Sequence, residues 1–211
     1  RSSFCGIGGL VVIETCAPQN QRAWMKIKAQ LVLFACAVFA GLNTWAATSN
    51  PCPDADGVSK VNGQLECLVI QTTPNKHKKT STTLLVYLHG DSSRGGMYDR
   101  HFKHFSGFAN QSTASNSIVF VGMIRPGYAD SNKNASTGST MGGGDNYTAH
   151  NVDAVANAIQ ALKAKYSARR VVLVGYSGGA ATAGVILGRH PDLIDDAVLI
   201  ACPCDLNIRR Q

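Results

Sequence analysis

The strongest fold signal in the sequence is the stretch Val171-Val172-Leu173-Val174-Gly175-Tyr176-Ser177-Gly178-Gly179-Ala180-Ala181. Its apolar first half is typical of a buried strand, and its small residues are typical of a helix that packs closely against a sheet. Between the two halves stands G-x-S-x-G, the pattern of a serine on a sharp strand-to-helix turn. A serine in that position is exposed and can be activated by a neighbouring base. The stretch therefore predicts a nucleophile elbow with Ser177 as the nucleophile.

The residues around Ser177 have supporting roles in this interpretation. Gly175, Tyr176 and Gly179 shape the turn, because glycines let the backbone pass close to the neighbouring strand and helix. The amide of Gly178 follows the nucleophile and lies at a helix N-terminus, so it is expected to stabilise a developing oxyanion.

A second signal, His89-Gly90-Asp91-Ser92, follows the apolar run at residues 84–88. Acyl transfer uses a second oxyanion donor from a loop after an adjacent strand. The amide of Asp91 or of Ser92 is the expected donor, and Gly90 allows the backbone to turn. His89 is expected to hold the loop through hydrogen bonds from its ring rather than to act as a base.

Strand-like and helix-like segments alternate from residue 47 onward. This order predicts an α/β fold with a mostly parallel central sheet flanked by helices. The expected strands are 65–71, 82–88, 118–123, 170–174 and 197–201, and the expected helices are 98–110, 148–166 and 178–188. Thr148 is a candidate N-cap of the second helix.

These features resemble the α/β-hydrolase superfamily, with the secreted serine esterase and prolyl-oligopeptidase-like branches as the most similar. The resemblance covers about residues 65–205 and includes Arg125-Pro126-Gly127-Tyr128 after a strand. It implies hydrolysis of a small-molecule or polymeric ester, or of a peptide, through an acyl-enzyme on Ser177. It also implies that neither a metal nor an organic cofactor takes part. A non-catalytic binding module, and a transferase or thioesterase on the same scaffold, remain open.

The sequence departs from the family in its triad, which runs serine, acid, histidine along the chain. His190 is the only histidine after Ser177, and the helix between them would separate the two by about 20 Å. His77, His101, His104 and His150 are expected on the surface, in loops or at a helix start. The fold is therefore expected to be incomplete, with its last strands, helices and histidine missing and the fragment inactive.

Asp205 is the candidate triad acid, because it follows the last predicted strand; the alternative is an ordinary loop aspartate. Asp195 and Asp196 precede that strand and are expected to be solvated at the opposite edge of the sheet. Residues 130–145, rich in Ser, Asn, Thr and Gly, predict a mobile loop that is either a lid or a surface insertion.

The first 46 residues are expected to lie outside the folded domain. Residues 25–46 have a basic start, an apolar centre and a small-residue end, which is typical of a signal peptide. The protein is then secreted or periplasmic without a stable membrane anchor, although a retained anchor is the alternative. Residues 1–24 are interpreted as upstream translation with no structural role, or as a genuine extension, and residues 47–211 as a partial hydrolase domain.

Four of the seven cysteines follow the signal segment. Cys52 and Cys67 flank a turn-rich stretch, and a disulfide between them would stabilise the fold by about 3 kcal/mol. Cys202 and Cys204 have one residue between them, which is poor spacing for a mutual bridge, so partners elsewhere are expected. None of these spacings fits a typical zinc site. The positive charges form no stripe with interleaved aromatic residues, so nucleic acid is not an expected partner.

Overall fold

A computed structural model describes residues 6–7, 10–14, 50–73, 82–91, 99–111, 117–140 and 147–205. The expected signal peptide and Ser92 lie outside these residues. In chain order, the elements are β1 (Gly6–Ile7), β2 (Leu10–Glu14), β3 (Lys60–Asn62), β4 (Cys67–Thr72), β5 (Thr82–Leu88), α1 (Asp99–Ser106), the 3₁₀ helix η1 (Gly107–Gln111), β6 (Ser117–Met123), α2 (Ala149–Lys165), β7 (Arg170–Tyr176), α3 (Gly178–Arg189) and β8 (Asp196–Ile200).

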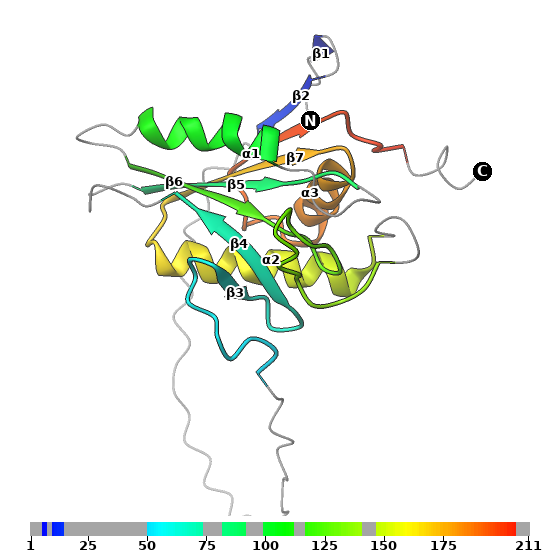
Figure 1. The fold of residues 1–211 in the computed structure, drawn as a ribbon. Helices are drawn as coiled ribbons and strands as arrows, with labels where there is room; N and C mark the ends of the chain where they lie inside the picture. Colours follow the sequence, from blue (N-terminus) through cyan, green and yellow to red (C-terminus); the bar gives the residue numbers. More distant parts are fainter. Residues whose placement is uncertain are drawn as a thin grey trace, which may run out of the picture. The chain divides into compact units, whose positions relative to one another are not determined.

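The strands form one sheet in the order β1-β2-β8-β7-β5-β6-β4-β3 (Figure 1). β5 pairs in parallel with β6 and with β7, and β7 pairs in parallel with β8. β4 is antiparallel to β6, and β3 is antiparallel to β4. This confirms the predicted α/β fold with a mostly parallel central sheet.

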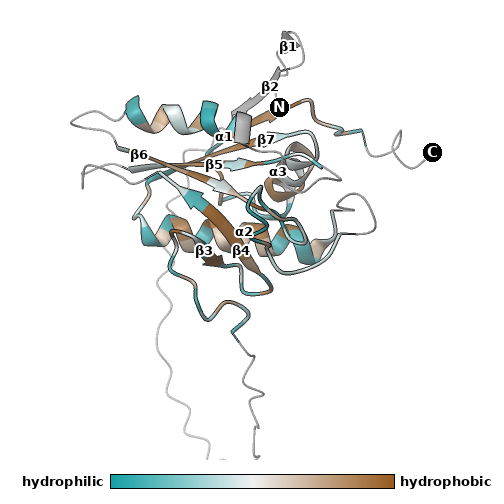
Figure 2. Cartoon of the chain, in the orientation of Figure 1, coloured by the Kyte–Doolittle hydropathy of each residue, from teal (hydrophilic) through white to brown (hydrophobic). Residues whose placement is uncertain are grey.

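The central strands are buried on both faces. One core cluster joins α2 and α3 to the sheet, and a second joins α1 to the opposite face. β5 and β6 contribute to both clusters, which explains their nearly continuous apolar sequences. Hydrophobic colour runs along β4 and β6 in Figure 2, whereas α1 and α2 carry hydrophilic residues on part of their surfaces.

The helices follow their sequence signals closely. Thr148 caps α2, with its side-chain oxygen accepting a hydrogen bond from the Asn151 amide at 3.3 Å, as predicted. The helix expected at residues 98–110 is divided into α1 and η1. Among the described residues, no helix has the length and apolar character needed to cross a membrane.

Two short N-terminal strands extend the sheet beyond β8. β2 pairs antiparallel with β8, from Leu10 opposite Ile200 to Glu14 opposite Asp196. β1 pairs in turn with β2. The physical reason is that the outer edge of β8 presents backbone N–H and C=O groups that an additional strand can pair.

The segment after β6 is anchored to β4 rather than loosely held. The Ser136 hydroxyl accepts a hydrogen bond from the Val69 amide at 2.9 Å and donates one to the Ile124 carbonyl at 2.7 Å. Thr137 accepts from the Cys67 amide at 2.7 Å. Residues 136 and 137 are thus hydrogen-bonded to β4 and to the residue after β6, whereas residues 141–146 lie outside the described part.

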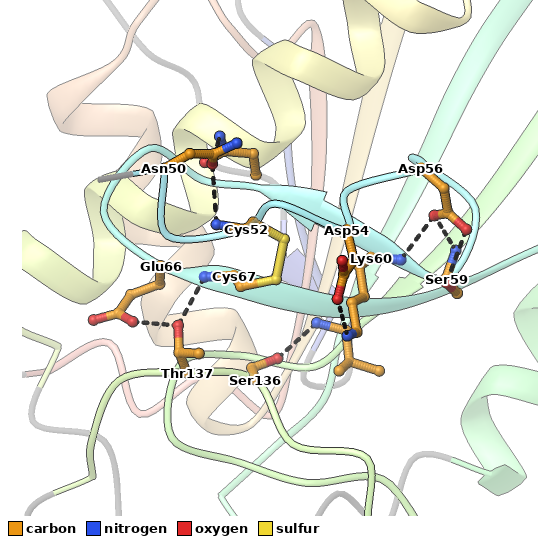
Figure 3. Close-up of a disulfide and its surroundings, with 12 residues drawn as sticks. Asn50, Cys52, Asp54, Asp56, Ser59, Lys60, Glu66, Cys67, Ser136 and Thr137 are labelled. Atoms are coloured by element: carbon orange, nitrogen blue, oxygen red, sulfur yellow. Dashed lines mark hydrogen bonds and ion pairs between the residues drawn. A yellow bond between two sulfur atoms is a disulfide. The ribbon is translucent and has the colours of Figure 1, made fainter. Parts of the chain in front are cut away.

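Two disulfides are present among the described residues. Cys52 is bonded to Cys67, with a Cα–Cα distance of 4.7 Å, which confirms the predicted bridge (Figure 3). Cys202 is bonded to Cys204, with a Cα–Cα distance of 5.1 Å. The expectation of separate partners for these two cysteines is wrong, because the extended segment after β8 keeps their Cα atoms within the usual disulfide range.

Candidate active site

Ser177 lies at the junction of β7 and α3, at the C-terminal edge of the sheet. Its backbone has φ 50° and ψ −116°, a conformation that is strained for a residue with a side chain. The Ser177 amide donates a hydrogen bond to the Ile200 carbonyl at the end of β8, at 2.9 Å. Its carbonyl accepts one from the Ala180 amide in the first turn of α3, also at 2.9 Å. The neighbouring strand and helix thus hold the serine in the strained turn.

Two glycines make this turn sterically possible. A Cβ atom on Gly175 would lie 2.5 Å from the Gly179 carbonyl oxygen. A Cβ atom on Gly179 would lie 2.2 Å from the carbonyl oxygen of Leu88 at the end of β5. Both obstructions are backbone atoms, so α3 can approach β5 and β7 this closely only when these positions lack side chains.

The loop after β5 lies directly beside the serine. A Cβ atom on Gly90 would be 3.1 Å from the Cβ of Ser177. The Asp91 carboxylate lies against Gly178, where a Cβ atom would be 2.2 Å from Oδ1. The structure therefore brings His89, Gly90 and Asp91 together with the turn at Ser177.

The Asp91 carboxylate is held by three side chains. It accepts hydrogen bonds from Arg125 Nη2, from the Tyr128 hydroxyl at 2.9 Å and from the Tyr147 hydroxyl at 2.7 Å. Burial raises the pKa of Asp91, but Arg125 and the two hydroxyls outweigh that effect and lower the pKa to about 2. Asp91 is therefore a carboxylate at neutral pH, with its oxygens directed toward these donors.

Arg125 connects the loop to α3. Its side chain is 0% exposed. Nε donates to the His89 carbonyl at 3.0 Å, and Nη1 donates to the Thr182 hydroxyl of α3 at 3.3 Å. The guanidinium carbon also lies 4.6 Å from the centre of the Tyr128 ring. One buried cation thus joins the ends of β5 and β6 to the helix that follows Ser177.

The His89 ring is occupied by backbone partners. Nε2 accepts a hydrogen bond from the Arg125 amide at 3.1 Å, so Nδ1 carries the proton and donates to the Gly90 carbonyl at 2.8 Å. Burial and the Arg125 charge lower the pKa of His89 to about 3. The ring is neutral at physiological pH, and both of its nitrogens are engaged.

Residues 105–208, which run from α1 past the end of β8, match the family model described as alpha/beta hydrolase fold. The chain has the α/β-hydrolase fold. None of the curated proteins compared with this sequence matches it significantly.

Several solved structures are similar to this α/β-hydrolase domain. An alpha-beta serine hydrolase homologue from Coxiella burnetii is 17% identical, with a TM-score of 0.44 and coverage of 62% of this chain and 57% of that one. An esterase from Exiguobacterium antarcticum is 16% identical, with a TM-score of 0.39 and coverages of 63% and 40%. Proline iminopeptidase from Mycobacterium smegmatis is 16% identical, with a TM-score of 0.43 and coverages of 64% and 40%. The chain spans less than two thirds of the length of each of these structures.

The other described histidines have partners or surroundings of their own. His101 lies in α1, is half-buried and stacks on the Tyr176 ring, with ring centres 4.6 Å apart. His104 is exposed. His150 contacts Glu66 at 2.8 Å, and His190 contacts Asp153 at 2.8 Å. His77 lies outside the described residues.

The remaining predicted acid, Asp205, is an exposed residue in the segment after β8 of the α/β-hydrolase domain. Asp195 and Asp196 lie at the other end of β8, as their order in the sequence requires. The Asp195 carboxylate accepts a hydrogen bond from the Val171 amide at 2.7 Å, and Asp196 pairs with Arg170 at 2.5 Å. Both acids thus have structural partners rather than being only solvated.

The charged network behind the loop could not be predicted from the sequence. Arg125, Tyr128 and Tyr147 all contact Asp91, although they lie on two segments that are distant from it in the chain. The run Arg125-Pro126-Gly127-Tyr128 was a visible signal after a strand, and a buried arginine requires an acidic partner. Tyr147 carried no comparable signal.

Proposed function

We propose that this protein is a serine hydrolase that cleaves carboxylic esters through an acyl-enzyme on Ser177. The observation that carries this proposal is the strained backbone of Ser177, held between the end of β7 and the first turn of α3. Strain of this kind persists where the surrounding structure enforces it, and it accumulates at functional sites. An ordinary helix start would not need a positive φ at a serine.

In the proposed reaction, the Ser177 oxygen attacks the ester carbonyl and a general base takes its proton. The tetrahedral oxyanion is stabilised by the Gly178 amide and by the amide of Asp91 or Ser92. Collapse of the intermediate expels the alcohol, which takes a proton from the base. Water then attacks the acyl-enzyme by the same route and releases the carboxylic acid.

The Asp91–Arg125 pair supports the electrostatics of this proposal. A lone carboxylate against Gly178 would repel a developing oxyanion, since like charges a few ångströms apart interact strongly in a buried site. The Arg125 guanidinium and two tyrosine hydroxyls bind the Asp91 carboxylate and compensate its charge. We therefore assign Asp91, Arg125 and His89 to positioning the oxyanion loop.

We further propose that the histidine base lies outside these 211 residues. The described histidines are engaged with backbone, aromatic or acidic partners or lie on the exposed face of α1. Asp205 is the proposed acid, because it follows β8 at the edge that carries Ser177. The isolated chain should then retain only the small acceleration that oxyanion stabilisation and binding supply.

A fluorophosphonate probe tests the nucleophile and the missing base together. We expect slow labelling at Ser177 of the 211-residue chain, at least tenfold faster labelling with added imidazole, and none in Ser177→Ala. Ser59→Ala, at an exposed serine, should label like the parent chain. Equal labelling of Ser177→Ala would contradict the nucleophile, and rapid stoichiometric labelling without imidazole would contradict the absent base.

A serine peptidase of the same fold, including the prolyl-oligopeptidase-like branch, is the second candidate. Esters and peptides react through the same acyl-enzyme, so the elbow favours neither. Ester, amide and thioester substrates supplied with imidazole would separate the esterase from the peptidase and thioesterase. A chain that binds acyl compounds but is never acylated on Ser177 would be a binding module.

We propose a secreted or periplasmic location, which the Cys52–Cys67 disulfide supports because such bridges persist in oxidising compartments.

A further inference from the structure

The segment after β8 carries a disulfide-bonded pair, Cys202 and Cys204, at the same sheet edge as Ser177. β7 and β8 are parallel neighbours, and Tyr176 is paired with Ile200. The carbonyl of Ile200 accepts the Ser177 amide at 2.9 Å. The disulfide-bonded segment therefore begins immediately beyond the backbone contact that supports the nucleophile.

The two disulfides among the described residues have different surroundings. Cys52 is 0% exposed, and its amide donates to the Asn50 side chain at 3.0 Å. Its partner Cys67 begins β4, and the Cys67 amide donates to Thr137 (Figure 3). Cys204 is exposed, whereas Cys202 is partly buried against the core cluster that includes α2 and α3. Cys67, like Cys202, is partly buried, so Cys204 is the exposed residue among these four cysteines and the one most open to a soluble thiol.

The short loop that the Cys202–Cys204 disulfide closes also makes this disulfide easier to reduce. It contains only Pro203, whereas the Cys52–Cys67 bridge has a sequence separation of 15. In the chain-entropy model, a bridge across a shorter loop stabilises the fold less. Pro203 restricts the backbone between the two cysteines. Ala201, which precedes Cys202, has a φ of 49°, an unfavourable value for a residue with a side chain. Exposed or conformationally restricted disulfides are the ones that exchange readily.

We propose that Cys202 and Cys204 form a thiol–disulfide exchange site for small thiols or protein dithiols. This function is separate from the proposed ester hydrolysis and does not depend on it. Reduction would convert the disulfide into two free thiols. It would thereby remove the cross-link between Cys202 and Cys204 in the segment from Ala201 to Asp205.

The order of the exchange follows from the exposure of the two sulfurs. A reductant thiolate attacks Cys204 Sγ, so a mixed disulfide forms and Cys202 leaves as a thiolate. A second reductant thiolate attacks the reductant sulfur of the mixed disulfide, which releases Cys204 as a thiolate. The protein disulfide gains two electrons, two reductant thiols become one disulfide, and two protons restore the protein thiols.

Redox titration of the whole chain tests the proposal. The chain is equilibrated in glutathione buffers of graded ratio, quenched in acid, alkylated after unfolding and digested with trypsin. Residues 190–209 form one tryptic peptide that carries both Cys202 and Cys204. We expect half-reduction of this peptide at a value of [GSH]²/[GSSG] at least tenfold lower than for Cys52–Cys67, a difference of about 30 mV.

The Cys52–Cys67 bridge is the internal control in the same samples. Half-reduction of the 190–209 peptide at the same ratio, or at a more reducing one, would overturn the proposal. Recovery of that peptide cross-linked to a different cysteine would also overturn it.

Single substitutions test which sulfur receives the attack. Oxidised glutathione should form a mixed disulfide with Cys204 in Cys202→Ser at least fivefold faster than with Cys202 in Cys204→Ser. The two variants remove the same bridge and differ only in which thiol remains, so their folding is matched. Equal or reversed rates would contradict the assignment of Cys204 as the attacked sulfur.

Discussion

At the scale of single residues, the contact between Asp91 and Arg125 links charge to backbone geometry. Arg125 is fully buried, so its charge depends on acceptors within the protein, and the Asp91 carboxylate is an acidic acceptor of its guanidinium. The same carboxylate lies against Gly178, next to the proposed nucleophile. Stability of the domain and geometry of the site therefore depend on one ion pair.

Asp91→Asn should destabilise the protein by about 3 kcal/mol, because a buried guanidinium would lose its carboxylate partner. Urea unfolding at neutral pH measures this change. Asp192→Asn, at an exposed aspartate after α3, should change stability by less than about 0.5 kcal/mol. The cost of Asp91→Asn should also shrink in an Arg125→Met background, and an unchanged cost there would rule out the ion pair as its cause.

His89 predicts a pH dependence of stability. Its pKa is about 3 in the folded protein against an ordinary value of 6.5, because of burial and the Arg125 charge. As the pH falls below 6.5, His89 becomes protonated in the unfolded chain but stays neutral in the folded chain. The free energy of unfolding therefore decreases until about pH 3. Above pH 6.5 this contribution is fully present.

We expect a loss on the order of 1 to 2 kcal/mol between pH 7 and pH 5 from this residue. Urea unfolding at the two pH values measures it. His89→Asn should remove that part of the pH dependence, whereas His150→Asn, at an exposed position, should retain it. A parent-like slope in His89→Asn would contradict the assignment.

At the scale of elements, the closeness of α3 to the sheet determines the elbow. Its first turn touches the ends of β5 and β7, where backbone atoms leave no room for a side chain at Gly175 or Gly179. Farther along α3, nothing lies within 4 Å of the Cβ positions of Gly184 and Gly188. Glycine is therefore required for close packing at the start of α3, whereas later in the helix a side chain would fit.

Gly179→Ala should destabilise the protein by about 3 kcal/mol or prevent folding, because its Cβ would overlap the Leu88 and His89 carbonyl oxygens at 2.2 and 2.6 Å. Gly184→Ala is the matched control, since nothing lies within 4 Å of its Cβ position. That substitution should stabilise the helix by about 0.5 to 1 kcal/mol. Thermal unfolding measures both, and shifts of the same sign would contradict the packing argument.

At the scale of the whole molecule, the Cys52–Cys67 bridge fastens the segment before β3 to the first residue of β4 (Figure 3). β4 in turn anchors residues 136–137 after β6. The bridge therefore supports the β3–β4 end of the sheet, which is distant in strand order from β8.

The double variant Cys52→Ser/Cys67→Ser should lower the free energy of unfolding by about 3 kcal/mol. Cys202→Ser/Cys204→Ser should lower it by about half as much, since its loop is far shorter. Denaturant unfolding without reductant measures both losses. An equal or larger loss from the Cys202/Cys204 variant would contradict the loop-length argument.

The sequence by itself determined the order of the central elements, the elbow at Ser177, the Thr148 cap and the Cys52–Cys67 bridge. These features depend on short-range patterns: apolar runs, a glycine-flanked serine, a capping threonine and nearby cysteines separated by turn residues. Their physical causes act within a few residues of each other, so they are readable along the chain.

Only the tertiary structure decided which distant groups meet. The contacts of Asp91 with Arg125, Tyr128 and Tyr147, the stacking of His101 on Tyr176, and the pairing of β2 with β8 all join separate segments. Such contacts depend on the packing of whole elements, because burial and charge compensation are satisfied in three dimensions rather than at fixed spacing along the chain.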